Sequence, residues 1–198
     1  MTDNEKFRVL GIVGNPLRQS MSPYLHNYWI KKYNINAYYL PFSIKKVKGI
    51  NISIKTLKFI GLNVTIPFKK VIIKELDNID KNAKSINAVN TIVNKGNKTK
   101  GYNTDIIGFK KGLEKTNMWD KKRPVFVFGA GGAAEAILHF LKIEKIKDIT
   151  IFNRTKSRVN KILRDYKQIK FVNNINNLNL KEAGLIINTT SLGMIGYP

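Results

Sequence analysis

The sequence predicts an α/β protein with two domains, and two patterns carry that prediction. In the second half, short apolar segments alternate with segments of helical pattern, which indicates parallel strands joined by crossover helices. A glycine-rich turn, Gly129–Ala134, directly follows the first of these strands. The first half also mixes strands and helices. We therefore expect an α/β domain over residues 1–104 and a nucleotide-binding domain over residues 105–198.

In the first half, apolar runs bounded by glycine, proline or asparagine predict strands. These runs are Phe7–Val13, Ala37–Pro41, Gly61–Pro67 and Thr91–Val93. A helix should start with Ser22 as its N-cap and Pro23 as its first helical residue, since both residue types favour those positions. A second, short helix is expected over Asp80–Ile86.

In the second half, four strands and two helices are expected. The run Pro124–Phe128 is continuously apolar, as in a strand buried on both faces. A helix should follow the glycines as far as Ile143, and the remaining elements are a strand at Asp148–Phe152, a helix at Lys156–Tyr166, and strands at Ile169–Val172 and Gly184–Asn188. The last strand should have an unpaired edge and expose apolar surface.

Composition excludes several classes of protein. Of the 198 residues, 43% are hydrophobic, which is too many for a disordered chain. The absence of cysteine excludes disulfides, thiolate metal sites and thiol nucleophiles, and two histidines do not suggest a metal centre. No apolar run approaches the roughly 20 residues that span a bilayer, and Met1–Lys6 is unlike a signal peptide. We expect a cytoplasmic protein with no membrane and no metal partner.

The net charge of +22 favours anionic ligands. Arginine, the preferred reader of bases and phosphates, supplies 6 of the 35 basic residues, and the 29 lysines are scattered along the chain. Lysine, isoleucine and asparagine share A/T-rich codons, so mutational drift accounts for much of the excess. We therefore expect no nucleic-acid partner, and binding that survives physiological salt would argue otherwise.

The turn after the first strand of the second half has the pattern G-x-G-x-x-A, with Gly129, Gly131 and Ala134 at the fixed positions. In a Rossmann-type domain the first glycine allows a tight turn, the second lets the backbone approach a pyrophosphate, and the third position allows close helix packing. Free N–H groups at the helix start bind the phosphates. The expected cofactor-binding residues here are Gly129, Ala130, Gly131, Gly132 and Ala133. The alternative is a glycine-rich turn without a ligand.

The end of the next strand indicates which dinucleotide is bound. An NAD site would place Asp or Glu about 20 residues beyond the glycines, but the sequence there is Asn153-Arg154-Thr155-Lys156-Ser157-Arg158. Arg154 and Arg158 are four residues apart, so both can face a 2′-phosphate. We expect NADP, held by Asn153, Arg154, Thr155 and Arg158. An ordinary basic helix start is the alternative.

Four clusters of small hydroxyl and amide residues lie near strand ends or helix starts in the first part of the chain. They are Ser20–Pro23, Asn63–Lys69, Ala88–Thr91 and Asn103–Asp105. Such groups suit a polyhydroxylated, carboxylated small molecule. Taken singly, each has an ordinary structural explanation, such as a helix cap for Ser22 or a turn for Asn90.

Taken together and in order, the motifs resemble the shikimate dehydrogenase family over nearly the whole chain. They are G-N-P-x-x-x-S-x-S-P-x-x-H-N at Gly14–Asn27, G-x-N-V-T-I-P-F-K at Gly61–Lys69, A-V-N-T at Ala88–Thr91, G-x-N-T-D at Gly101–Asp105, G-A-G-G-A-A at Gly129–Ala134, N-R-T-x-x-R at Asn153–Arg158 and N-T-T-S-x-G-M at Asn188–Met194.

The resemblance implies reversible, NADPH-dependent reduction of 3-dehydroshikimate to shikimate, a step of chorismate and aromatic amino-acid biosynthesis. It implies that Ser20 and Ser22 bind the substrate carboxylate, and that the ring hydroxyls are bound by Asn63, Thr65, Asn90 and Asp105. It also implies that Lys69 is the catalytic acid/base, with Asp105 beside it. The oligomeric state is left open, with a homodimer as the candidate assembly.

The chain also departs from the family pattern. Gln19 and Asn87 stand where the family commonly has His and Gly, and neither change removes an expected ligand. Family members are longer by roughly a quarter to a third, and add strands of the nucleotide sheet, helices that return to the first domain, and a Tyr and a Gln that contact substrate. Two interpretations stay open: the sequence is a fragment of a longer gene product, or it is complete, in which case we expect weak or no catalysis and poor solubility.

Two alternatives to a shikimate dehydrogenase stay open at this point. One is a quinate/shikimate dehydrogenase, which often prefers NAD and would favour an acid near Asn153. The other is a truncated, non-catalytic ligand-binding relative, against which Lys69 and Asp105 argue. The two histidines, His26 and His139, are expected to be structural, with His26 packed under the serine loop and His139 half exposed on a helix.

Overall fold

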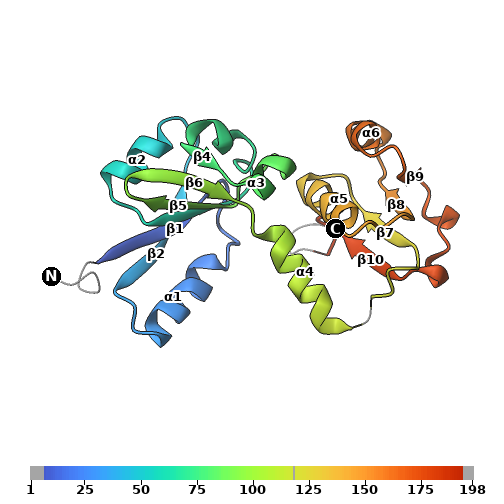
Figure 1. The fold of residues 1–198 in the computed structure, drawn as a ribbon, viewed down its shortest axis with the longest axis horizontal. Helices are drawn as coiled ribbons and strands as arrows, with labels where there is room; N and C mark the ends of the chain where they lie inside the picture. The colour runs from blue at the N-terminus through green and yellow to red at the C-terminus, as the bar shows by residue number, and fades with distance from the viewer. Residues whose placement is uncertain (1–6, 118, 194–198) are drawn as a thin grey trace. The chain divides into compact units, whose positions relative to one another are not determined.

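The computed structural model describes residues 7–117 and 119–193 (Figure 1). The segment Met1–Lys6 and the last motif residue, Met194, lie outside them. The chain forms two compact units, residues 1–104 and 105–198, which are described separately. In the described ranges no helix is long and apolar enough to cross a membrane.

The first unit is built on one six-stranded sheet with the order β2-β1-β3-β5-β6-β4. Strand β1 pairs in parallel with both β2 and β3, whereas β5 runs antiparallel to β3 and β6. The strands are β1 (Arg8–Gly14), β2 (Ala37–Ser43), β3 (Gly61–Val64), β4 (Asn78–Ile79), β5 (Thr91–Lys95) and β6 (Lys98–Tyr102). The helical segments are α1 (Ser22–Lys32), α2 (Ile50–Thr56), the 3-10 helix η1 (Val71–Glu75) and α3 (Lys81–Ile86).

All the elements expected in this unit are present, but the structure adds α2, η1, β4 and β6. The sequence of α2 is rich in β-branched residues, which disfavour a helix, and burial of Ile50 and Ile54 on one side stabilises it nonetheless. Strand β6 is polar and gave no apolar signal. It forms because Gly96 and Asn97, both at positive φ, make the tight hairpin turn that joins it to β5.

The expected N-cap role of Ser22 is wrong. Helix α1 begins at Ser22, Met21 occupies the cap position, and no side chain caps the helix there. The hydroxyl of Ser22 instead hydrogen-bonds the side chain of Tyr39 on β2. Asp80, by contrast, caps α3 by accepting from the backbone N–H of Asn82 at 3.0 Å.

The second unit has an all-parallel, four-stranded sheet with the order β10-β7-β8-β9. The four strands and the helices α5 and α6 confirm the elements expected from the alternating pattern, and α4 is an addition. The elements are α4 (Asp105–Thr116), β7 (Val125–Phe128), α5 (Gly132–Ile143), β8 (Ile149–Phe152), α6 (Lys156–Asp165), β9 (Lys170–Val172), the 3-10 helices η2 (Ile175–Asn177) and η3 (Leu180–Glu182), and β10 (Leu185–Asn188).

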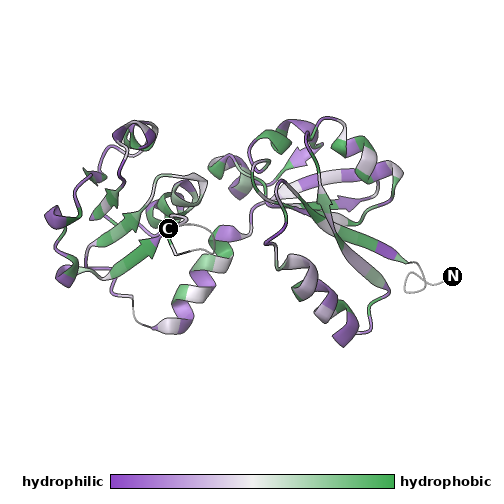
Figure 2. Ribbon diagram, turned by 180° about the vertical axis from the view of Figure 1, so that it is seen from behind, coloured by the Kyte–Doolittle hydropathy of each residue, from purple (hydrophilic) through white to green (hydrophobic). Residues whose placement is uncertain are grey.

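The core of the second unit lies between its sheet and α5. Val125 and Val127 of β7 are fully buried, as are Leu138 and Leu141 of α5. Figure 2 shows the strands of this sheet as largely hydrophobic, whereas hydrophobic and hydrophilic residues alternate along α4. Strand β10 lies at the sheet edge and Ile186 is 50% exposed, as the sequence predicted for the last strand.

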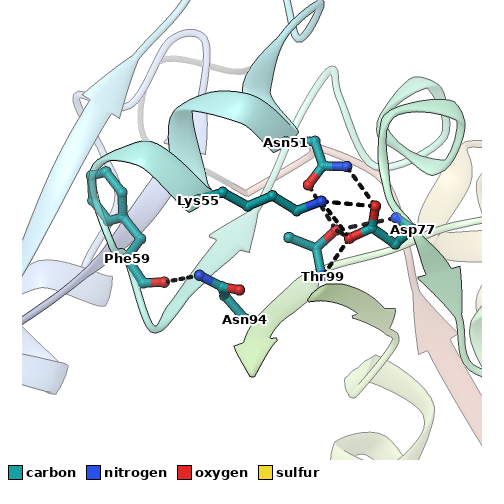
Figure 3. Close-up of polar contacts among 6 residues, drawn as sticks. All are labelled: Asn51, Lys55, Phe59, Asp77, Asn94 and Thr99. Carbon is teal, nitrogen blue, oxygen red and sulfur yellow. Dashed lines mark hydrogen bonds and ion pairs between the residues drawn. The ribbon is translucent and has the colours of Figure 1, made fainter. Parts of the chain in front are cut away.

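A polar cluster fastens α2 to β6 and to the segment before β4 (Figure 3). The carboxylate of Asp77 accepts from Lys55 Nζ at 2.9 Å, from Asn51 Nδ2 at 3.1 Å and from the Thr99 backbone N–H at 2.7 Å. The Thr99 N–H contributes most to holding the pKa of Asp77 well below its ordinary value of 3.8, followed by Lys55. The ionised carboxylate is therefore the form that ties these elements together.

Replacement of this carboxylate should destabilise the first unit in a pH-dependent way. Because the folded-state pKa of Asp77 is lowered, its contribution to stability is complete above pH 3.8 and declines as the pH falls below that value. We expect Asp77→Asn to lower the urea midpoint at pH 7, and the gap from the wild type to narrow below pH 3.8. Asp165→Asn, with the same change in net charge, is the control. A gap that does not vary with pH would contradict this assignment.

Candidate functional site

The register of the first sheet brings four polar segments to one edge. Strands β1 and β3 are parallel, with Val13 opposite Val64, so the segments that follow them leave the sheet side by side. Antiparallel β5 begins at the same edge, with Thr91 opposite Asn63, and β6 ends there, with Tyr102 opposite Thr91. The clusters around residues 20–23, 63–69, 88–91 and 103–104 therefore converge.

Tyr39 joins two of these segments, although no motif marks it in the sequence. Its ring is 2% exposed, and its hydroxyl donates to Asn63 Oδ1 at 2.6 Å. The hydroxyl of Ser22 hydrogen-bonds the same phenol and acts to lower its pKa; because the phenol donates its one hydrogen to Asn63, the serine is the donor in that bond. Burial, the larger effect, raises the pKa of Tyr39 to about 12, so the phenol remains a donor near neutral pH.

Asn63 continues this chain of hydrogen bonds into β5. Its Nδ2 donates to Thr91 Oγ1 at 3.2 Å and to the Asn90 carbonyl at 3.3 Å. Thr91 in turn donates its hydroxyl to Asn90 Oδ1 at 2.9 Å. The half-buried Asn63 is thus fixed at both ends of its amide, which gives it one orientation at the sheet edge.

Asn90 is buried and organises the end of the unit. Its Oδ1 accepts from the backbone N–H of Thr104 at 3.0 Å, and its Nδ2 donates to Thr104 Oγ1 at the same distance. Asn103 is also buried, and its amide donates to the Ala88 carbonyl at 3.1 Å. Thr104, a residue of the G-x-N-T-D motif for which no role is expected, is therefore held as firmly as the expected ligands.

Lys69 lies in the turn after β3 and is half buried. Its carbonyl accepts from the backbone N–H of Val89 at 2.7 Å, so this turn is tied to the segment that carries Asn90. Thr65, also half buried, is tied to β1 by its N–H, which donates to the Val13 carbonyl at 2.9 Å. Both expected site residues are therefore anchored to neighbouring segments through their backbones.

The serine loop approaches the same turn. A side chain at Gly14 would collide with the methyl group of Thr65, so glycine is needed where the loop leaves β1. Further along the loop, Ser20 Oγ accepts from the Ser22 backbone N–H at 3.4 Å. Ser20 and Ser22 are both half buried; Ser22 is the first residue of α1, and Ser20 lies two residues before it.

Asp105 is the first residue of α4 and belongs to the second unit. It is exposed and follows Thr104 directly in the chain. Its expected position beside Lys69 stays a prediction, as do the substrate roles of the residues above.

The first unit therefore offers hydroxyl and amide groups held in fixed orientations, with a lysine on the adjoining turn. In the part of the chain that the structure describes, no cluster of three His, Cys, Asp or Glu side chains could hold a metal ion. Neutral donors and acceptors beside a cation suit an anionic molecule that carries several hydroxyl groups.

The second unit carries the glycine turn between β7 and α5. Gly129 has φ +106°, and a Cβ there would lie 2.6 Å from Thr189 Oγ1, so glycine is required both for backbone conformation and for space. At Gly131 and Gly132 a Cβ would meet nothing within 4 Å, so packing does not explain these glycines. Open space above a helix N-terminus fits a pyrophosphate approached closely by the backbone.

The turn after β8 holds the two expected arginines. The Asn153 amide donates to the Thr155 carbonyl at 2.8 Å, which shapes the turn, and α6 begins at Lys156. Arg154 and Arg158 are exposed, and neither guanidinium is paired with an acidic side chain of the described residues. These unpaired cations at a helix start fit a phosphate group.

The burial of both histidines agrees with the structural roles expected for them, which stay predictions. The His26 ring stacks on Tyr39, with centroids 4.2 Å apart and 5° between the planes, and burial lowers the pKa of His26. His139 is half buried on α5, and its pKa is lowered by burial and then by Lys142.

The hydroxyl of Tyr39 can be tested without any ligand. Tyr39→Phe keeps the buried ring but leaves Asn63 Oδ1 without its donor, which should cost about 1–3 kcal/mol in free energy of unfolding. The measurement is chemical denaturation. Tyr38→Phe is the matched control, since Tyr38 is 58% exposed on the opposite face of β2, and it should leave the midpoint unchanged. Equal midpoints for both variants would show that the phenol contributes nothing.

Comparison with known proteins agrees with both halves of the chain. Residues 12–92 match the family model described as the shikimate dehydrogenase substrate binding domain, and residues 112–194 match the model described as shikimate / quinate 5-dehydrogenase. Shikimate dehydrogenase (NADP(+)) of Pelagibacter ubique (strain HTCC1062) is 39% identical, over 92% of this chain and 69% of the relative.

Solved structures are similar as well. Shikimate dehydrogenase of Aquifex aeolicus superimposes with a TM-score of 0.87 at 36% identity, covering 98% of this chain and 73% of that one. A shikimate dehydrogenase solved in complex with NADP+ gives a TM-score of 0.83, also at 36% identity, over 98% of this chain and 70% of the other. The protein accordingly belongs to the shikimate dehydrogenase family.

Proposed function

We propose that this protein catalyses the reversible, NADP-dependent reduction of 3-dehydroshikimate to shikimate. The observation that carries the proposal is the convergence, at one sheet edge, of the oriented Ser22–Tyr39–Asn63 chain with the turn that carries Lys69. A relative at 39% identity is named for this NADP-dependent activity. The reaction belongs to the biosynthesis of chorismate and aromatic amino acids.

In this proposal the substrate lies against the polar edge of the first sheet. Ser20 and Ser22 bind its carboxylate; Ser22 is the first residue of α1, and Ser20 lies two residues before it. The ring hydroxyls are bound by Asn63, Thr65, Asn90 and Asp105. The hydrogen bonds that already hold Asn63 and Asn90 favour this role, because preoriented groups bind without further loss of conformational freedom.

Lys69 is the acid/base of the proposed reaction. NADPH, when bound, supplies the hydride that goes to the carbonyl carbon. The carbonyl oxygen then gains negative charge, and the Lys69 ammonium stabilises that charge and donates a proton to the oxygen. In the reverse direction the neutral amine accepts the proton from the hydroxyl. Asp105 is proposed to orient the ammonium.

The cofactor is proposed to bind the second unit at two places. Its pyrophosphate contacts the backbone of Gly129–Ala133, where the space above Gly131 and Gly132 is open. Its 2′-phosphate lies between Arg154 and Arg158, with Asn153 and Thr155 shaping the turn. The absence of an acid at this turn favours NADP over NAD.

Lys69→Ala tests the chemical step. Loss of a group that stabilises developing charge should lower kcat by on the order of 10²–10³ with the affinity for NADP+ unchanged. The measurement is the absorbance of NADPH formed from shikimate and NADP+. Lys74→Ala, at an exposed position on η1, is the control and should behave as the wild type. Equal losses in kcat and in NADP+ binding would count against Lys69 as acid/base.

Arg154→Gln and Arg158→Gln test the choice of cofactor. Loss of a charge-assisted bond to the 2′-phosphate should raise the KM for NADP+ by about 10- to 100-fold and leave the KM for NAD+ unchanged. Arg164→Gln removes the same charge from the last turn of α6 and should change neither constant. A parallel rise for both dinucleotides would place the arginines elsewhere in the site.

The remaining expectations stay predictions with simple measurements. Oxidation rates with quinate and with shikimate distinguish a quinate/shikimate dehydrogenase from a shikimate dehydrogenase. A folded chain that binds NADPH but shows no turnover would indicate the non-catalytic, ligand-binding relative. Sedimentation velocity measures whether the protein is a homodimer, and retention on DNA at physiological salt would contradict the expected lack of a nucleic-acid partner. A cytoplasmic location is expected.

A further inference from the structure

Helix α1 holds Tyr39 at two places, through two successive residues. The His26 imidazole stacks on the Tyr39 ring. The Asn27 carboxamide binds the Tyr39 backbone: its Oδ1 accepts from the N–H at 2.9 Å, and its Nδ2 donates to the carbonyl at 2.8 Å. One turn of α1 thus contacts both the side chain and the backbone of Tyr39 on β2.

The same helix carries Ser22 at its first position, four residues before His26. Residues four apart lie on the same face of a helix, so the face that packs His26 on the phenol ring also presents the Ser22 hydroxyl to the phenol oxygen. The position of α1 along β2 therefore decides whether Ser22, Tyr39 and Asn63 are in line.

The Asn27 bonds fix that position. They join α1 to backbone groups of Tyr39 that face away from β1. Every second residue along β2 bonds to β1, and this series includes the flanking residues Asn36 and Ile44, which lie three and five residues from Tyr39. Tyr39 therefore belongs to the other set, whose N–H and carbonyl groups point outward. Without Asn27, water could bind the same N–H and carbonyl on the outer side of β2, so much of the hydrogen bonding would be retained. Water does not hold a helix in register, and the alignment of Ser22 with Asn63 would be lost.

We propose that Asn27 is a positioning residue for the substrate: by clamping the Tyr39 backbone it fixes α1 on β2 and holds Ser22 and Asn63 at the spacing that the substrate requires. The inference rests on the proposed function for the identity of the substrate. It extends that function to a residue that acts through Tyr39, whose backbone N–H and carbonyl both bind its amide.

The kinetic test compares Asn27→Ala and Asn27→Asp with the wild type. Misplacement of binding groups by about 1 Å can cost on the order of 100-fold. We expect the KM for shikimate to rise by about tenfold or more in Asn27→Ala, with the KM for NADP+ within about twofold of the wild type. Asn27→Asp keeps the acceptor but cannot donate to the Tyr39 carbonyl, so it should not restore the shikimate KM.

Asn94→Ala is the matched control. Asn94 lies in the same unit and also binds backbone through its amide, donating to the Phe59 carbonyl at 2.9 Å from β5 (Figure 3). It should leave both KM values within about twofold of the wild type. A rise in the shikimate KM for Asn94→Ala equal to that for Asn27→Ala would reduce Asn27 to a general structural role and overturn the proposal.

A second readout does not depend on activity. In the wild type the phenol of Tyr39, with its pKa of about 12, should stay largely un-ionised up to about pH 11 in a ¹³C NMR titration of the tyrosine ring. In Asn27→Ala the loosened ring should ionise nearer to the ordinary value of 10, whereas in Asn94→Ala it should not. An unchanged Tyr39 titration in Asn27→Ala would overturn the clamp. A wild-type chain that neither binds nor oxidises shikimate, with the titration as expected, would overturn only the proposed substrate.

Discussion

The parallel pairing of β1 with β3 is the constraint on which the first unit depends. It places the serine loop and the Lys69 turn at the same edge of the sheet, although about 50 residues separate them. Antiparallel β5 and β6 then begin and end at that edge, so Asn90 and Thr104 join the same group. A shift of one residue in this register would turn Asn63 to the other face of the sheet and break its bond to Tyr39.

Hydrogen bonds at this edge hold the polar side chains in one geometry and limit their movement. The donor and acceptor atoms of Asn63 and Asn90 are engaged by other residues of the network. A buried network of this kind is stable only if it is satisfied throughout, and then it specifies one arrangement. The polar edge of the first unit is therefore preorganised, with donor and acceptor groups at fixed spacings.

Much of the fold could be predicted from the sequence, and the failures have identifiable causes. The second sheet follows from alternating apolar segments, because parallel strands buried on both faces leave a strong signal. Helix α2 and strand β6 were missed because tertiary packing and a hairpin turn, and not local propensity, form them. Ser22 was assigned to a helix cap because its partner, Tyr39, lies 17 residues away and on another element.

Within the site, the motifs predicted which segments matter but not how they are connected. Tyr39 was overlooked because a buried aromatic residue in an alternating strand is ordinary core, and only the structure shows its hydroxyl between two polar side chains. Asn27 was quoted as a motif residue without a role for the same reason. Long-range pairing decides what a polar residue does, and a single sequence contains little information about it.

Asn27 also covers part of the lateral edge of the sheet, the outer side of β2. Strand β2 is an edge strand, and the outward backbone groups of such a strand invite pairing with another chain. Asn27 occupies the N–H and carbonyl of Tyr39, and two residues further along Pro41 has no N–H to offer on the same side. By binding these two groups, Asn27 therefore also hinders the addition of another strand at this part of β2.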